Sequence, residues 1–283
     1  MKFDIIVNKY ILMWHLLFGR SINTEIHKEK QRIWNEKKNE YIKLQKEKDI
    51  ILKDIENYIP DDDDVFDDLE NTESYRKIKQ ETNRYRLTLL EAIDKNKKIY
   101  LRELNKILRY NFKSSYTICA IHPSLDVVEI DFDKNNIITI GKKFTPKESD
   151  DLLTYLIYKI VKNDLLNIKS DEKIIINTIV ELVATNELYT RITKQSKYNL
   201  GKKELKEVKH LIYPYWLMYL GIKPNDLEKY MVRDNIFFNK NAYKYEENLK
   251  NLDILSFIKF ITKNKQRIFT VPKKEIEEAI EEL

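Results

Sequence analysis

The sequence predicts a mainly helical α+β protein, in which an N-terminal helical hairpin is followed by helices packed on a small antiparallel sheet. Only four glycines and six prolines interrupt the 283 residues, and this scarcity favours long regular elements with few tight turns. Apolar residues make up 42% of the chain, which is enough for a sizeable hydrophobic core. Their spacing is helical almost throughout, and only the stretch 115–140 is rich in β-branched runs.

An N-terminal helical domain is expected over residues 1–95. The apolar run 10–18 is shorter than the roughly 20 residues that span a bilayer, so we expect a buried helix there; an interfacial membrane helix and a partner-docking helix are the alternatives. A heptad pattern occupies 34–58, a second helical pattern occupies 75–92, and an acidic run at 61–70 separates them. We therefore expect an antiparallel helical hairpin joined by a solvated acidic loop.

The remaining residues, 96–283, are expected to form a mainly helical α+β domain that contains the small sheet. A short helix is expected over 100–110. After it, β-branched runs predict three strands, at 115–121, 126–132 and 137–140. Short turns join these runs, and short connections of this kind predict antiparallel hairpins.

The clearest start signal of a helix lies at 145–148. Thr145 is a predicted N-cap, a proline occupies the first helical position, and Glu148 stands at the third, which together make a capping box. Apolar residues then recur at helical spacing as far as Val161 and form one broad face. We expect this helix to pack on the sheet through that face.

A line of polar residues runs through the most hydrophobic helix of the chain, which is predicted over 172–192. Asn177, Glu181 and Thr185 recur at every fourth position, so they lie on one side of that helix. An unpaired buried carboxylate is costly, and Glu181 therefore needs a cation, a hydrogen-bond donor, a metal or a water-filled cleft. One interpretation is a buried network in which Glu181 pairs with a lysine or arginine of a neighbouring helix. The other is a cleft that binds a ligand or a partner.

The order of short antiparallel strands, a core helix and a second helix that bears a glutamate resembles the zincin metallopeptidases of the gluzincin type. In that family the first helix carries the motif H-E-x-x-H and the second carries the third zinc ligand. Thr154, Tyr155 and Tyr158 occupy the positions of the first histidine, the general base and the second histidine, and Glu181 corresponds to the downstream ligand. Since threonine and tyrosine do not supply a zinc site, the resemblance implies a degenerate relative without metal or catalysis.

Two further groups of residues are candidates for binding. One is a set of lysines on a single helical face, which is a candidate anion-binding site or a solvated surface: Lys202, Lys206 and Lys209. The other is a crowded aromatic segment: Tyr213, Tyr215, Trp216 and Tyr219. These aromatic side chains are expected either in the core, with their phenols donating hydrogen bonds to the polar line, or at an exposed protein interface.

Several classes of function find no support in the sequence. Each glycine stands alone and the four histidines are scattered, so we expect no phosphate-binding loop, no metal, no other cofactor and no catalytic residues. Cys119 is the only cysteine, which fits a reducing compartment. The net charge of +5 arises from 51 basic and 46 acidic residues, which gives only weak support to nucleic-acid binding.

We therefore expect a non-catalytic protein–protein interaction or assembly protein, located in the cytoplasm or associated with a virion. The bias towards lysine, isoleucine, asparagine and tyrosine is typical of AT-rich genomes, so a bacterial or phage origin is expected. Its partner would be another protein, bound through the hairpin of residues 22–93, and no transmembrane segment is expected. A degenerate zincin-like relative and a weak nucleic-acid-binding protein are the alternatives.

Overall fold

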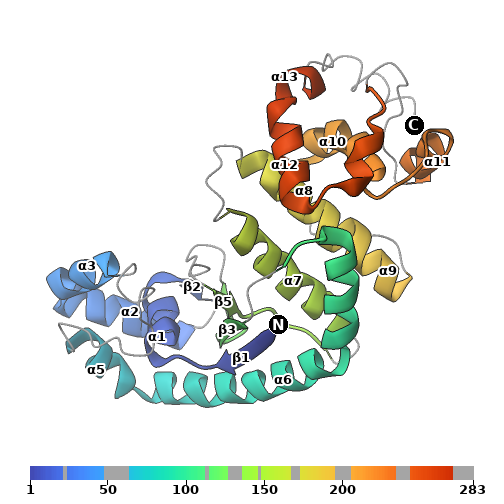
Figure 1. Ribbon diagram of the computed structural model, residues 1–283. Helices are drawn as coiled ribbons and strands as arrows, with labels where there is room; N and C mark the ends of the chain where they lie inside the picture. Colours follow the sequence, from blue (N-terminus) through green and yellow to red (C-terminus); the bar gives the residue numbers. More distant parts are fainter. Residues whose placement is uncertain are drawn as a thin grey trace. The chain divides into compact units, whose positions relative to one another are not determined.

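The computed structural model is mainly helical and contains a small three-stranded sheet, which confirms the mainly helical α+β class (Figure 1). It describes residues 1–21, 24–47, 64–111, 115–126, 136–145, 148–166, 173–194, 205–233 and 243–269. The chain divides into two compact units: unit 1 comprises Met1–Lys97 and Lys113–Asn163, and unit 2 comprises Lys98–Phe112 and Asp164–Leu283. The sheet belongs to unit 1 together with the N-terminal helices, whereas the sequence-based division assigned it to the domain that begins at residue 96.

The sheet of unit 1 is parallel, so the prediction of an antiparallel sheet is wrong. Its strands are β1 (Lys2–Ile6), β3 (Ser115–Ala120) and β5 (Ile137–Ile140), in the order β1-β3-β5, and both neighbouring pairs are parallel. In the central strand, Ile118 lies opposite Ile5 on one side and Ile138 on the other. Every residue of β5 is buried, as is typical of parallel strands that are covered on both faces.

The antiparallel prediction failed because, among the described residues, the first and third expected segments pair in parallel and the described start of the second pairs with the N-terminal part of the chain. The strand expected over 126–132 begins as β4 (Leu125–Asp126), which pairs antiparallel with β2 (Arg20–Ser21) and not with β3. The rest of that expected strand, 127–132, lies outside the described residues. The third strand of the sheet, β1, comes from the N-terminus. Ile5 is its only buried residue, so β1 lacks the regular alternation of buried and exposed positions by which a strand is recognised in a sequence.

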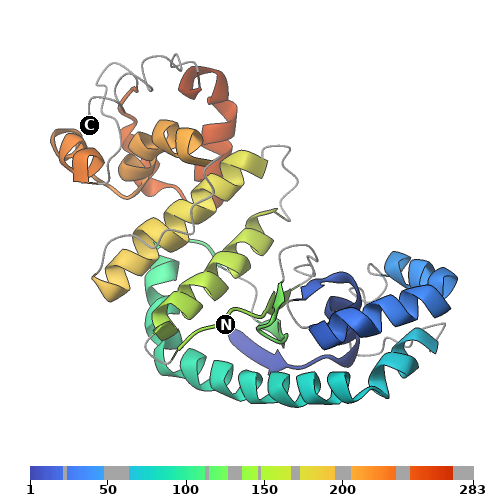
Figure 2. The same cartoon turned by 180° about the vertical axis from the view of Figure 1, so that it is seen from behind.

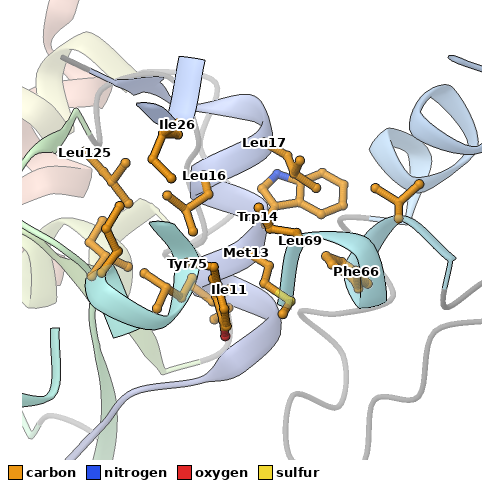
Figure 3. Close-up of a cluster of buried hydrophobic side chains, with 14 of the residues drawn as sticks. Ile11, Met13, Trp14, Leu16, Leu17, Ile26, Phe66, Leu69, Tyr75 and Leu125 are labelled. Carbon is orange, nitrogen blue, oxygen red and sulfur yellow. The ribbon is translucent and has the colours of Figure 1, made fainter. Parts of the chain in front are cut away.

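A hydrophobic core surrounds helix α1 (Lys9–Phe18), which confirms the buried helix expected over 10–18. Asn8 caps this helix, and its Oδ1 accepts hydrogen bonds from the backbone N–H groups of Tyr10 and Ile11, both at 3.0 Å. All residues from 11 to 17 are buried. Figure 3 shows α1 side chains among core residues from other elements, which include Ile26, Phe66, Leu69, Tyr75 and Leu125.

Short helices around α1 form the described part of the first arm of the predicted hairpin and of the acidic run. The first arm is divided into α2 (Thr24–Glu36) and α3 (Lys38–Lys46), because Lys37 between them has a non-helical backbone. The acidic run was expected to be a solvated loop, but its described part forms helix α5 (Asp64–Glu70), and residues 48–63 lie outside the described residues. Three apolar side chains of α5 are 1% exposed and pack into the core: Val65, Phe66 and Leu69. Their burial stabilises the helix despite its negative charge.

Helix α6 (Glu73–Leu108) joins two helices that the sequence predicted separately, over 75–92 and 100–110. The segment between them is polar but contains no glycine or proline, so nothing in its composition ends the helix. In Figure 1, α6 runs beneath strand β1, and Arg86 Nη1 donates a hydrogen bond to the backbone oxygen of Ile5 at 3.3 Å. The second arm of the predicted hairpin therefore packs on the sheet.

Helix α7 (Ser149–Leu166) begins three residues after position 146, which the capping box predicted as its first residue. Glu148 Oε2 accepts a hydrogen bond from the backbone N–H of Thr145 at 2.7 Å, and this bond is the main reason that the pKa of Glu148 is lowered. Lys159 Nζ donates to the backbone oxygen of Thr139 at 2.7 Å and so connects α7 to β5. The expected contact between this helix and the sheet is therefore present.

Unit 2 consists of helices in most of its described part (Figure 2). The helix predicted over 172–192 is present as three consecutive segments: α8 (Lys173–Glu181), the π-helix η2 (Leu182–Leu188) and α9 (Tyr189–Thr193). The helices that follow are α10 (Lys206–Tyr219), α11 (Pro224–Arg233), the 3-10 helix η4 (Glu247–Asn251), α12 (Ile254–Lys263) and α13 (Lys265–Ile268). Among the described helices of the whole chain, none combines the length and the apolar composition that crossing a membrane requires.

Candidate functional site

The helix formed by α8, η2 and α9 carries the predicted polar line. Glu181 is 3% exposed and Thr185 is 2% exposed, whereas Asn177 is half-buried. Thr185 Oγ1 donates a hydrogen bond to the backbone oxygen of Glu181 at 2.7 Å, so this hydroxyl is used within its own helix. The carboxylate of Glu181 is therefore the group of the line with the greatest need for a partner from another helix.

Lys209 of α10 lies beside this carboxylate. Its Nζ is 3.7 Å from Glu181 Oε2, and the two side chains are 15% and 4% exposed, respectively. At this depth the attraction between opposite charges is stronger than at the surface, because little water screens it. The lysine thus offsets the negative charge of a carboxylate that lies buried among apolar side chains.

The same contact changes the interpretation of the three lysines. Lys206 is exposed, Lys202 lies outside the described residues, and Lys209 is largely buried next to Glu181. A lysine that neutralises a buried carboxylate is not free to bind a phosphate group. Among the described residues, the candidate anion-binding face is therefore reduced to a single exposed lysine.

Asn186 is a polar residue of this site that the sequence did not reveal. It lies in the π-helix η2 and is 7% exposed, and its Oδ1 is 3.3 Å from Thr185 Oγ1. Within the described part of the chain, its Nδ2 and the Oδ1 of Asn177 have no hydrogen-bond partner. The hydrogen bonds of a π-helix join residues five apart, so its turns are wider than those of the α-helix whose spacing singled out Thr185. No pattern in the sequence indicates such a wide turn.

The aromatic residues of α10 are core residues. Their exposed fractions are between 0 and 2%: Tyr213, Tyr215, Trp216 and Tyr219. Trp216 stacks on Tyr219 with the ring centroids 5.1 Å apart, and Phe257 of α12 packs against both rings. The phenol of Tyr219 donates to the backbone oxygen of Ile107 at 2.5 Å and not to the polar line. Side chains buried to this extent cannot contact another protein, so they do not form an exposed interface.

The positions that resemble a degenerate zincin motif lie on α7 in unit 1. Thr154 is buried, and Tyr155 and Tyr158 are half-buried. Lys142 Nζ lies 5.2 Å from the centroid of the Tyr155 ring, so a cation–π contact occupies the position at which the family has its general base. Glu181 belongs to unit 2. Among the described residues, no group of three or more histidine, cysteine, aspartate or glutamate side chains is arranged to hold a metal ion.

Three polar side chains of unit 1 that the sequence did not connect are hydrogen-bonded to one another. Glu81 of α6 places Oε2 2.9 Å from His122 Nε2, and His122 Nδ1 is 2.6 Å from Ser124 Oγ. Glu81 and His122 are 41 residues apart in the sequence, so no local spacing connects them. The fold brings α6 to the turn after β3, and only this makes the contact. The only local signal was the separation of His122 and Ser124 by a single proline.

Helix α6 also presents apolar side chains on its outer face. Leu87 is 53% exposed and Leu90 is 39% exposed, and their spacing places them on the same side of the helix. In the described part of the expected binding region 22–93, the third exposed large apolar side chain is Trp34 of α2, at 39%.

Comparison of this chain with family models, curated proteins and solved structures gives no match. Its function is therefore inferred from these surfaces and sites.

Proposed function

We propose that this protein is an interaction or assembly protein of a bacterium or phage, and that it binds a helical partner protein through the outer face of α6. The observation that carries the proposal is the pair of exposed leucines, Leu87 and Leu90. Apolar side chains that stand together on a surface favour association, because a partner removes them from water. The pair also lies within residues 22–93, the region that the sequence indicated for binding.

Contacts with the rest of unit 1 hold α6 in place behind these leucines. On its inner side, Leu89 and Ile93 are at most 1% exposed. Tyr85 Oη donates to the backbone oxygen of Lys142 at 2.8 Å, and Asn96 Nδ2 donates to Asp150 Oδ1 at 3.1 Å. A surface anchored in this way loses little conformational freedom on binding, so more of the contact energy remains as affinity.

The chemistry of this face supports a helical protein as the partner. Leu87 and Leu90 have the spacing that forms a ridge on a helix, and such ridges pack into the grooves of a second helix. Their exposed neighbours are polar and carry both signs of charge, as at the rim of a protein interface: Asn83, Arg84 and Glu91. A nucleic-acid backbone binds through clustered lysines and arginines that neutralise its phosphates, whereas the charges on this face are mixed.

The compartment that fits this proposal is the cytoplasm, or the virion if the gene belongs to a phage. Cys119 is the only cysteine of the chain and is buried in the central strand. A chain with a single, buried thiol suits a reducing environment.

Affinity purification with a matched pair of variants tests the proposal. Tagged wild-type protein, L87D/L90D and I174D are expressed in the native host, and the captured proteins are compared by mass spectrometry. Ile174 is 46% exposed in unit 2, so I174D makes the same chemical change on a surface outside the proposed site. We expect a partner that wild type and I174D capture and that L87D/L90D loses. An identical set of proteins on all three baits would contradict the proposal.

A further inference from the structure

A tight turn in unit 1 places a serine hydroxyl against a histidine ring. The backbone N–H of Leu125 donates to the carbonyl oxygen of His122 at 2.9 Å, which closes a β-turn with Pro123 and Ser124 at its centre. Within this turn, Ser124 Oγ lies 2.6 Å from His122 Nδ1, and the backbone N–H of Ser124 donates to the same nitrogen at 3.1 Å. Because the proline restricts the backbone, the hydroxyl and the imidazole are held together.

The hydrogen bonds of the ring decide which of its nitrogens carries the proton. A backbone N–H can only donate, so Nδ1 of His122 is the acceptor and carries no proton. The proton of the neutral ring is therefore on Nε2, which donates to Glu81 Oε2 at 2.9 Å. The hydroxyl of Ser124 thus faces the lone pair of a base, and a carboxylate holds the other side of that base. This is the order of groups that activates a serine nucleophile.

The group lies at the edge of the sheet where parallel strands end. His122 follows the carboxyl end of the central strand β3, and Lys143 follows the carboxyl end of the adjacent strand β5. Binding sites of open parallel sheets form at this edge, because the loops that leave the strands meet there. The His122 side chain is 15% exposed and Ser124 is half-buried, so both side chains are partly open to solvent.

The charges around His122 suit the role of a general base. Burial, the largest effect, lowers the pKa of His122, Glu81 raises it, and the positive charge of Lys143 lowers it further. With its pKa below the ordinary value of 6.5, His122 is neutral at pH 7 and able to accept a proton. Lys143 is exposed and follows β5 closely in the chain.

We propose that Ser124 is a nucleophile that accepts the acyl group of a small carboxylic ester, an activity that does not depend on the partner-binding face of α6. Ser124 Oγ bonds to the carbonyl carbon while its proton passes to His122 Nδ1, and the ammonium of Lys143 stabilises the negative carbonyl oxygen. The bond to the alcohol oxygen then breaks, and the alcohol leaves with the proton from Nδ1. Water attacks the acyl-serine in the same way, which releases the carboxylic acid and restores the hydroxyl. Glu81 positions the imidazole in each step through its hydrogen bond with Nε2.

Covalent labelling of the full-length protein tests this assignment. The protein is incubated with a fluorophosphonate probe, and the labelled peptide is identified by mass spectrometry. We expect the label on Ser124, and H122N should react at least about 100-fold more slowly, because general-base catalysis contributes on the order of 100-fold or more. S74A removes another half-buried serine of unit 1 and should react like wild type. Circular dichroism establishes that each variant is folded.

The pH dependence of labelling distinguishes a reacting serine from one that only closes a turn. The wild-type rate should rise with pH through the pKa of His122. In E81Q the midpoint should move to lower pH, because the carboxylate that raises this pKa is gone. The ester p-nitrophenyl acetate should give a burst of p-nitrophenol with wild type and none with S124A. An unlabelled Ser124, or equal rates in folded H122N and wild type, would overturn the proposal.

Discussion

Replacing Lys209 by methionine should strongly destabilise unit 2, because it removes the cation beside a buried carboxylate. Glu181 is 3% exposed, and its Oε2 is 3.7 Å from Lys209 Nζ. Removing one partner of a buried ion pair costs about 3–5 kcal/mol, whereas an exposed pair contributes about 0–1 kcal/mol. The Glu181 side chain is almost fully buried, but the pair is long and the lysine is 15% exposed. We therefore expect K209M to lower the free energy of unfolding by about 3 kcal/mol, the lower end of the buried range.

Urea unfolding of four variants measures this effect as a double-mutant cycle. K206M changes an exposed lysine of the same helix and should stay within about 0.5 kcal/mol of wild type. E181L/K209M removes both charges, and an apolar pair of similar size should recover most of the stability that K209M loses. E181L completes the cycle. If K209M unfolds like K206M, or if the losses of E181L and K209M simply add in the double variant, the pair does not stabilise the unit.

Two further predictions concern the core of unit 1 and can be measured by urea unfolding. L16A truncates a fully buried side chain of α1 in the hydrophobic core and should lower the free energy of unfolding by about 3 kcal/mol. A loss below about 1 kcal/mol would contradict the conclusion that the core is built around α1. Y41F removes the hydrogen bond from Tyr41 Oη to the backbone oxygen of Leu17, 2.5 Å long, and should cost about 1–2 kcal/mol at pH 7. Burial raises the pKa of Tyr41 from 10.0 to about 12, so its contribution is complete below pH 10 and is lost as the pH rises through 12. Y41F should therefore lose less stability than wild type over that interval, and equal losses would contradict this role.

Elements stabilised by contacts close in sequence were predictable from the sequence. Both partners of the capping box, Thr145 and Glu148, lie within one turn, and the hydrogen bond between them is present. The apolar run of α1, which a single histidine interrupts, predicted a buried helix, because a helix that is apolar on nearly all sides must be covered on nearly all sides. These features do not depend on how the rest of the chain folds.

Elements that depend on distant contacts were not predictable in this way. Strand β1 pairs with β3, which lies far along the chain, so short turns between neighbouring β segments suggested the wrong sheet. Helix α5 forms in an acidic run because three apolar side chains, Val65, Phe66 and Leu69, find a core that includes residues of α1. The charge pattern alone predicted a loop, and tertiary burial outweighs it.

The candidate sites show the same division. Glu181 was identifiable because a carboxylate in a highly apolar helix needs a partner wherever it lies. The choice of Lys209 among many lysines depends on the packing of α8 and α10, and the role of Asn186 depends on a π-helical turn. The contact between Glu81 and His122 depends on the path of α6 past the end of β3, which no local pattern specifies.

The most direct test of the proposed interaction is the affinity of the purified partner for wild type, L87D/L90D and I174D, measured by isothermal titration calorimetry. Complete burial of a leucine stabilises by about 1.5–3 kcal/mol, and since roughly half of each side chain is exposed, the pair contributes about 2 kcal/mol. L87D/L90D should therefore bind at least about 30-fold more weakly than wild type. I174D should bind like wild type. Equal affinity of all three proteins would contradict a binding site on the outer face of α6.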